Sequence, residues 1–197
     1  MKDRPKAGWA WTVLGLWAAG LTLVGSVLLG RHLIALPRPE PSAAATRAFA
    51  GLRQPGDGAH WLAVHVLYAG CRCSARVVDH LVQAAHIPSV REVVLWVGRD
   101  AESEARLAAA GLRVVDVDPQ VLQDRFGVEA APVLVVLDEQ DRARYVGGYT
   151  ARKQGPDIQD RKILTALLGG AVPDENPVLG CAVSARLDKA LNPVGLP

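Results

Sequence analysis

The chain has 197 residues, half of them hydrophobic, and a formal net charge of +2. This length favours one domain of ordinary size with accessory segments. The near-neutral charge supplies no basic stripe that would neutralise phosphates, so we expect no nucleic-acid partner. Its three cysteines, Cys71, Cys73 and Cys181, are too few and too odd in number for a disulfide-stapled secreted scaffold. We therefore expect the cysteines to be reactive rather than to hold the fold together through disulfides.

Residues 1–36 are predicted to form an N-terminal membrane anchor. Three basic residues precede an uncharged stretch over residues 8–30, which as a helix would rise about 35 Å, enough for a hydrocarbon layer of about 30 Å. A cleavable signal peptide is the alternative, with small residues at 42–45, but its apolar region should span only about 7–15 residues. The basic excess before the span predicts a single-pass protein with a cytoplasmic N-terminus and an extracytoplasmic domain, periplasmic in a Gram-negative bacterium. Disulfides persist in that compartment.

Residues 37–57 are rich in Pro, Ala and Gly and are predicted to form a semi-extended tether. Residues 58–170 then alternate between strand-like and helix-like patterns. We predict strands over 61–68, 90–98, 112–118, 132–139 and 142–150, and helices over 74–86, 101–111, 119–127 and 157–170. Helical crossovers make the early strands parallel, and the last hairpin adds an antiparallel strand. The expected fold class is therefore α/β, a three-layer sandwich with a mixed sheet.

Residues 171–197 form a Pro-rich C-terminal tail that carries Cys181. The tail is not expected to be helical. Its apolar "PVLGCAV" would be costly to leave in water, so we expect it to dock on the domain. Cys181 is then either a resolving thiol or third ligand, or a buried free cysteine that behaves as a small hydrophobe.

The other two cysteines stand where a predicted buried strand turns into a helix. A cysteine at a helix N-terminus meets unsatisfied N–H groups and the positive end of the helix dipole, which favour the thiolate. Arg72 adds a further positive charge. Because the thiolate is the species that attacks disulfides, the turn is expected to expose a reactive sulfur, and Cys71 is the first candidate nucleophile.

The spacing of the pair leaves two interpretations open. With one residue between them, Cys71 and Cys73 would close a strained, easily reduced disulfide, which predicts an oxidising couple. Alternatively, Cys71 pairs with Ser74: the two are separated by two residues, the usual spacing of redox cysteines, with Ser in place of the second cysteine. Cys73 is then auxiliary.

The strand that ends in paired cysteines, followed later by "Ala131-Pro132-Val133", resembles the thioredoxin fold over residues 58–170. The extra helix–strand–helix at 101–127 resembles the membrane-anchored TlpA-type and peroxiredoxin-like branch. "GGYTARKQG" and "NPVLGC" are similar to segments of RedB-type membrane-anchored redox proteins, although that family carries Cys-Pro-Cys after a His-Pro pair and this chain has "AGCRC". The resemblance implies that Pro132 is cis, abuts the cysteines and presents backbone to an extended substrate segment. An ordinary trans proline at a strand start is the alternative.

His80 lies seven residues after Cys73, so the two can share a helix face. Together with the other cysteines they would make a set suited to Cu(I) or Zn. No tight ligand spacing supports such a site, so we expect a packed or solvent-facing His80, no metal and no cofactor. His60 and His65 are expected to be structural.

These patterns predict a membrane-tethered, extracytoplasmic thiol–disulfide oxidoreductase that exchanges disulfides with protein substrates. A mixed disulfide would form at Cys71, and Cys73 or Cys181 would resolve it, with Pro132, Arg72 and Ser74 in supporting positions. The alternatives are a thioredoxin-like module that binds or delivers a metal such as copper through the same cysteines, or a non-catalytic scaffold.

Overall fold

The structure, a computed structural model, describes residues 6–152 and 157–192. It divides into two compact units, Met1–Ile34 and Ala35–Pro197. The first unit holds helix α1 (Lys6–Leu33), in which Gly8–Ser26 has a mean hydropathy of 1.3 and no residue buried by the protein. Hydroxyls of Thr12 and Thr22 donate to carbonyls four residues earlier, which satisfies them within the helix. An N-terminal apolar helix of this length suits a signal sequence or a membrane anchor.

The second unit is built on a five-stranded mixed sheet with the strand order β3-β2-β1-β5-β6. The pairs β1–β2 and β2–β3 are parallel, whereas β1–β5 and β5–β6 are antiparallel. This confirms the predicted parallel early strands and the antiparallel closing hairpin. The five strands are β1 (Trp61–Tyr68), β2 (Val90–Val97), β3 (Arg113–Asp116), β5 (Val133–Leu137) and β6 (Ala143–Gly147).

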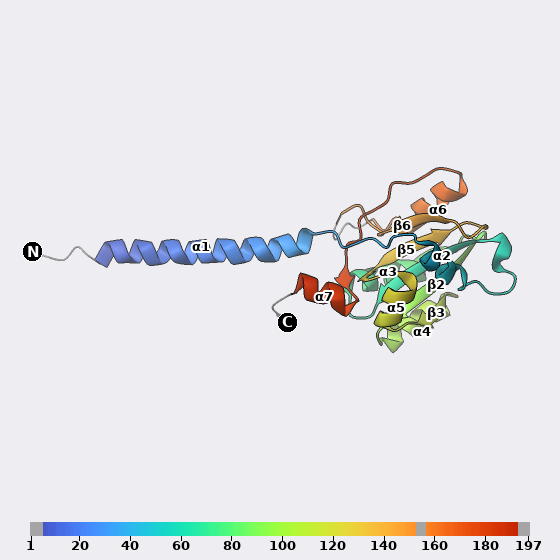
Figure 1. The fold of residues 1–197 in the computed structure, drawn as a ribbon, viewed down its shortest axis with the longest axis horizontal. Coiled ribbons are helices and arrows are strands. Elements are labelled where there is room, and N and C mark those ends of the chain that lie inside the picture. Colours follow the sequence, from blue (N-terminus) through green and yellow to red (C-terminus); the bar gives the residue numbers. More distant parts are fainter. Residues whose placement is uncertain (1–5, 153–156, 193–197) are drawn as a thin grey trace, which may run out of the picture. The chain divides into compact units, whose positions relative to one another are not determined.

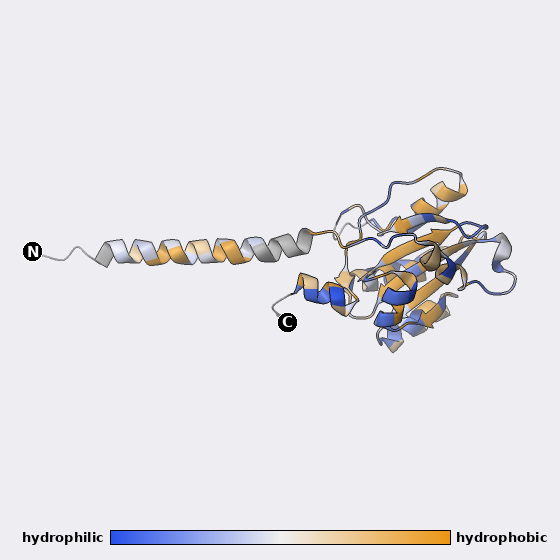
Figure 2. Ribbon diagram, viewed as in Figure 1, coloured by the Kyte–Doolittle hydropathy of each residue, from blue (hydrophilic) through white to orange (hydrophobic). Residues whose placement is uncertain are grey.

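Helices cover both faces of this sheet (Figure 1). One layer contains α3 (Arg72–Gln83), α4 (Ala101–Ala109) and α6 (Asp160–Leu168), and the other contains α2 (Ala43–Ala50), α5 (Pro119–Phe126) and α7 (Ala185–Leu191). Strands buried on both faces read as continuous apolar runs rather than as alternating patterns. Figure 2 shows this as a largely hydrophobic sheet between helices of mixed character. The three-layer α/β class is confirmed, including the extra helix–strand–helix of α4, β3 and α5.

Two segments differ from their predicted structure. A semi-extended conformation is wrong for residues 43–50, which form α2. The hydroxyl oxygen of Ser42 accepts a hydrogen bond from the backbone N–H of Ala45 and caps this helix. The buried Phe49 packs against Phe126 of α5, with ring centroids 5.0 Å apart. The high Pro, Ala and Gly content of residues 37–57 favoured an extended tether, although residues 43–50 within it carry a short apolar helix face.

The C-terminal tail is also more regular than expected. Residues 185–191 form α7, so the prediction of a non-helical tail is wrong there. Ser184 caps this helix by accepting from the N–H of Leu187, which is itself buried. The two-residue strand β7 (Cys181–Ala182) precedes it and pairs with β4 (Ala130–Ala131) in a second, small sheet.

Candidate active site

The turn from β1 into α3 is fixed by backbone and side-chain contacts. Cys71 is the N-cap of α3 in an extended conformation, and its N–H donates to the carbonyl of Tyr68 (3.0 Å). The fully buried Ser74 accepts a hydrogen bond through its hydroxyl oxygen from the N–H of Tyr68 (3.0 Å). A Cβ at Gly70 would lie 2.9 Å from the Tyr68 ring, so the Tyr68 side chain would have to shift to admit a larger residue there. The helix therefore starts two residues before the predicted position, with Cys71 at its end and Cys73 in its first turn.

The segment between α5 and β5 faces this turn. The Ala131–Pro132 peptide bond is cis, as the resemblance implies. The carbonyl oxygen of Ala131 lies 3.6 Å from Sγ of Cys71. Sequence positions 71 and 131–132 are thus brought together, as expected.

The C-terminal tail docks on the same place. Cys181 stands opposite Ala131 in the antiparallel pairing of β7 with β4. Two glycines allow the close approach: a Cβ at Gly180 would lie 1.9 Å from the Ala131 carbonyl oxygen, and one at Gly148 would lie 2.0 Å from that of Pro177. Val178 between them is fully buried. The expectation that the tail docks is therefore confirmed, and it does so beside the strand-to-helix turn.

The docked tail changes the exposure of the cysteines. Cys71 is only 1% exposed, whereas Cys73 and Cys181 are half-buried, and none of the three forms a disulfide. The expectation that the turn exposes the Cys71 sulfur is wrong. The C-terminal tail docks beside the turn, and local sequence patterns do not predict a contact over so long a separation. The sulfur that remains accessible at the helix terminus belongs to Cys73.

The surroundings of Cys71 stabilise its thiolate. Hydrogen bonds from the Cys181 and Cys73 side chains lower the pKa of Cys71 most strongly, and burial opposes them by raising it. The backbone N–H groups of Ser74 and Cys73 lower it further, as expected at a helix N-terminus. The pKa of Cys71 ends far below the ordinary thiol value. Cys181, whose role the sequence left open, is thus the largest single cause of the lowered pKa of Cys71.

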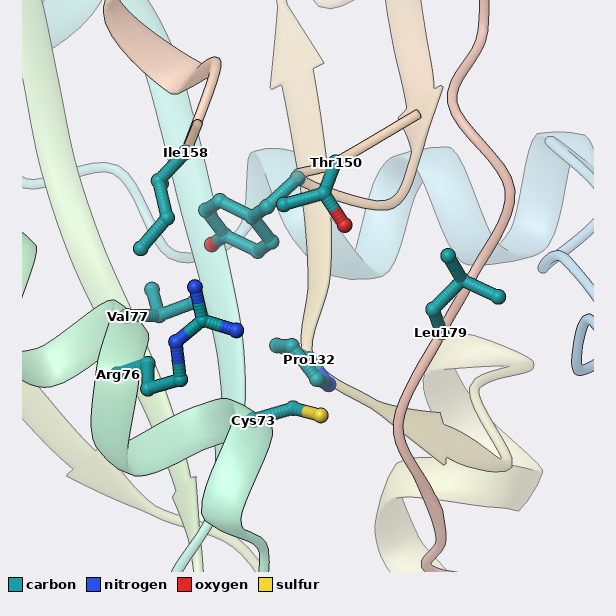
Figure 3. Close-up of a pocket in the computed structure, with 8 residues that line it drawn as sticks. Cys73, Arg76, Val77, Pro132, Thr150, Ile158 and Leu179 are labelled. Carbon is teal, nitrogen blue, oxygen red and sulfur yellow. The ribbon is translucent and has the colours of Figure 1, made fainter. Parts of the chain in front are cut away.

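A hollow opens beside Cys73. In Figure 3 the Cys73 sulfur points toward Pro132, and the Arg76 guanidinium extends over the same space from the next turn of α3. Tyr149 lines another part of the wall. Leu179, from the docked tail, lies on the side of the hollow beyond Pro132 (Figure 3). Arg72, which the sequence proposed as an auxiliary residue, is exposed and does not line the hollow. Arg76 was not predicted as a site residue, although it lies three residues after Cys73 and therefore on the same helix face.

A buried polar network lies behind this hollow. The hydroxyl of Tyr149 is 2.8 Å from Nδ1 of the buried His65, whose Nε2 is 3.1 Å from Glu92. Arg161 donates to both carboxylate oxygens of Glu92 (2.9 and 3.1 Å), and His86 contacts the same group at 3.1 Å. Burial raises the pKa of Glu92, but hydrogen bonds and charge from His65 and Arg161 outweigh it and hold the pKa well below its ordinary value. His65 therefore has the structural setting that was expected.

The other histidines also have protein partners. Nε2 of His80 lies 2.7 Å from the buried Asp160, and Nε2 of His60 lies 3.2 Å from Arg91. His80 is thus packed against α6 rather than grouped with the cysteines. Within residues 6–152 and 157–192, no group of three or more His, Cys, Asp or Glu side chains is arranged to hold a metal ion.

Comparison with known proteins bears on the fold. The sequence matches no protein-family model and no curated protein. Among solved structures, the chain is similar to an uncharacterised conserved protein from Geobacillus kaustophilus, with 19% identity, a TM-score of 0.54, and coverage of 77% of this chain and 90% of that one. It is also similar to a hypothetical protein from Sinorhizobium meliloti 1021, with 20% identity, a TM-score of 0.53, and coverage of 64% and 80%. At sequence identities this low, the similarity shows a shared fold and nothing further.

The mixed sheet, the cysteine at a helix N-terminus and the facing cis-proline make up a thioredoxin-like α/β fold.

Proposed function

We propose that this protein is a membrane-tethered, extracytoplasmic thiol–disulfide oxidoreductase that exchanges disulfides with protein substrates through Cys71 and Cys73. The observation that carries the proposal is the position of the Cys71 sulfur, at the N-terminus of α3 and 3.6 Å from the Ala131 carbonyl oxygen of the cis Ala131–Pro132 segment, where its surroundings lower its pKa. A thiolate at a helix terminus is the species that exchange chemistry requires. The half-buried Cys73 beside it lines a hollow open to a partner.

The burial of Cys71 favours Cys73 as the sulfur that first meets the partner. An incoming disulfide exchanges with the Cys73 thiol: a bond forms between Cys73 and one partner sulfur, and the partner's S–S bond breaks. The departing sulfur takes up the proton of Cys73. The Cys71 thiolate then attacks Sγ of Cys73, closes a disulfide between them and releases the second partner sulfur. Two electrons pass from the domain to the partner, and the same steps run in reverse with a partner dithiol.

The surrounding residues support these steps by position. Ser74 ties α3 to the end of β1, which holds Cys71 beside Ala131 and Cys73 beside Pro132. Pro132 forms the wall of the hollow opposite α3 (Figure 3). Arg72, exposed between the two cysteines, adds positive charge that favours the thiolate. Helix α1 would tether this chemistry to the membrane, on the side where protein disulfides persist.

Trapping the first intermediate tests the proposal. The full-length Cys71→Ser protein, reduced and then mixed with bis(2-hydroxyethyl) disulfide, should accumulate a mixed disulfide on Cys73, because the attacking thiolate of the second step is missing. Digestion with trypsin places Cys73 in the peptide 73–76, apart from the other cysteines. An adduct on that peptide, seen by mass spectrometry after acid quenching, is the expected result. A Cys73 that stays unmodified while the unfolded chain reacts would overturn the order of steps.

A further inference from the structure

The C-terminal segment occupies a strand edge directly beside the reactive cysteines. Strand β4 has only two residues, and its partner in the small sheet is β7 from the C-terminal tail. An uncovered strand edge presents backbone N–H and C=O groups that an extended peptide can pair with. Here the chain fills that edge itself, and it does so with the residue Cys181 opposite Ala131.

The contacts on both sides of Cys181 fix its position. Gly180 approaches the Ala131 carbonyl too closely for any side chain, and the N–H of Leu36 donates to the carbonyl of Val178 at 2.8 Å. On the other side, Ser184 and Arg186 both bond the carboxylate of Glu129, which precedes β4. The segment is therefore held before and after the cysteine.

This placement brings two sulfurs together that are far apart in the sequence. Cys181 stands opposite Ala131, whose carbonyl oxygen is 3.6 Å from Sγ of Cys71. Interaction with the Cys181 side chain is also the largest cause of the lowered pKa of Cys71. Cys73, by contrast, shares a single helical turn with Cys71. A disulfide across one intervening residue departs from relaxed geometry and is readily reduced, whereas a pair on separate segments can reach relaxed geometry.

We propose that residues 178–182 act as a built-in substrate strand and that Cys71 and Cys181 form the stable disulfide of the oxidised domain, with Cys73 passing the disulfide inward from the partner. This inference rests on the proposed function and extends it from two cysteines to three. It assigns Cys181 as the resolving thiol, the first of the two possibilities that the sequence left open.

The inward transfer is an exchange without net oxidation. The sulfur of Cys181 attacks Sγ of Cys71 in the transient Cys71–Cys73 disulfide, so that a Cys71–Cys181 bond forms and the Cys71–Cys73 bond breaks. Cys73 leaves as a thiolate and takes up the proton that Cys181 loses. Both electrons have already gone to the partner disulfide in the preceding steps. Cys73 is thereby restored for its next encounter.

Disulfide mapping of the full-length protein tests this directly, because trypsin cleaves after Arg72 and Arg76. The three cysteines fall in three different peptides, 54–72, 73–76 and 163–186. After oxidation with bis(2-hydroxyethyl) disulfide and blocking of remaining thiols, we expect the 54–72/163–186 pair to be the main cross-link. A main cross-link between 54–72 and 73–76 would overturn the inference while leaving the proposed function intact. Absence of any exchange would contradict both.

Two glycine variants, one at the docked tail and one as its control, test the position of the tail. Gly180→Ala would drive a Cβ into the Ala131 carbonyl, whereas Gly169→Ala at the end of α6 would place its Cβ in ordinary contact, at 3.4 Å or more. We expect Gly180→Ala to lose the 54–72/163–186 cross-link in favour of 54–72/73–76, and Gly169→Ala to keep the wild-type pattern. Circular dichroism of both variants confirms that the domain is folded. A folded Gly180→Ala protein that retains the wild-type cross-link would contradict the built-in strand.

Discussion

Cys181 stands opposite Ala131 in an antiparallel bridge, and the carbonyl oxygen of Ala131 lies 3.6 Å from the sulfur of Cys71. One backbone position therefore links the C-terminal tail to the strand-to-helix turn. Through it the tail influences both properties of Cys71 that matter for exchange, its access to partners and its protonation.

Cys181→Ser is expected to raise the pKa of Cys71. Hydrogen bonding from the Cys181 side chain is the largest cause of the lowered pKa, so its replacement by a hydroxyl on a shorter bond weakens the stabilisation of the thiolate. Because a thiolate is lost as the pH falls through its pKa, the ultraviolet absorbance of the thiolate should disappear at a higher pH in this variant. Cys71→Ser identifies the signal by removing it. An unchanged midpoint would show that Cys181 does not act on Cys71.

Phe49→Ala is expected to destabilise the second unit by roughly 3–5 kcal/mol, the usual cost of removing a buried aromatic ring. Phe49 is 3% exposed and packs on Phe126, so α2 belongs to the hydrophobic core. Arg47→Ala, on the exposed side of the same helix, should change the free energy of unfolding by at most about 0.5 kcal/mol. Urea denaturation measures both. Equal, small effects would mean that residues 43–50 behave as a tether after all.

Glu92→Gln is expected to lower stability near neutral pH by roughly 1–3 kcal/mol. It removes the charge that pairs with Arg161 in a largely buried setting and leaves Asp160, at 3.4 Å, as the remaining acidic neighbour of Arg161. The folded-state pKa of Glu92 is lowered, so its contribution is present above the unfolded value of about 4.3 and is lost as the pH falls through the folded value. The stability difference between wild type and variant should therefore shrink in acid. Denaturation series at several pH values would show this, and a difference independent of pH would contradict it.

The full-length protein is expected in the membrane fraction, with residues 8–30 retained. The uncharged stretch is longer than the apolar region of a cleavable signal peptide, and Gly8–Ser26 has the composition of a membrane span. Fractionation with N-terminal sequencing checks both points. Recovery in the soluble fraction, or a new N-terminus near Ala45, would indicate a cleaved signal instead.

The sequence predicted the layers well because strong periodicity marks each long element. β1 falls on the predicted residues, and α4 and α5 begin at the predicted residues 101 and 119. It did not predict α2 or the strand β7, because short elements take their stability from tertiary partners rather than from local pattern. Phe49 needs Phe126, and Cys181 needs Ala131.

The same reason explains the partial success at the site. Cys71, Cys73 and Pro132 were predicted together because they belong to motifs along the chain. The burial of Cys71 depends on where the tail docks, and that depends on the space left by Gly180 and Gly148. The sequence alone does not show that these glycines permit a close backbone contact, because that contact involves residues far away in the chain.

The rate of complete disulfide exchange with and without the Cys71 sulfur tests the central claim most directly. Reduced full-length protein is mixed with bis(2-hydroxyethyl) disulfide, and released mercaptoethanol is followed with time beside Cys71→Ser. Wild type should release both halves of the disulfide, whereas Cys71→Ser should stop after the first, with an unchanged circular dichroism spectrum. If folded Cys71→Ser protein releases both halves at the wild-type rate, Cys71 is not the exchange thiolate and the account is wrong.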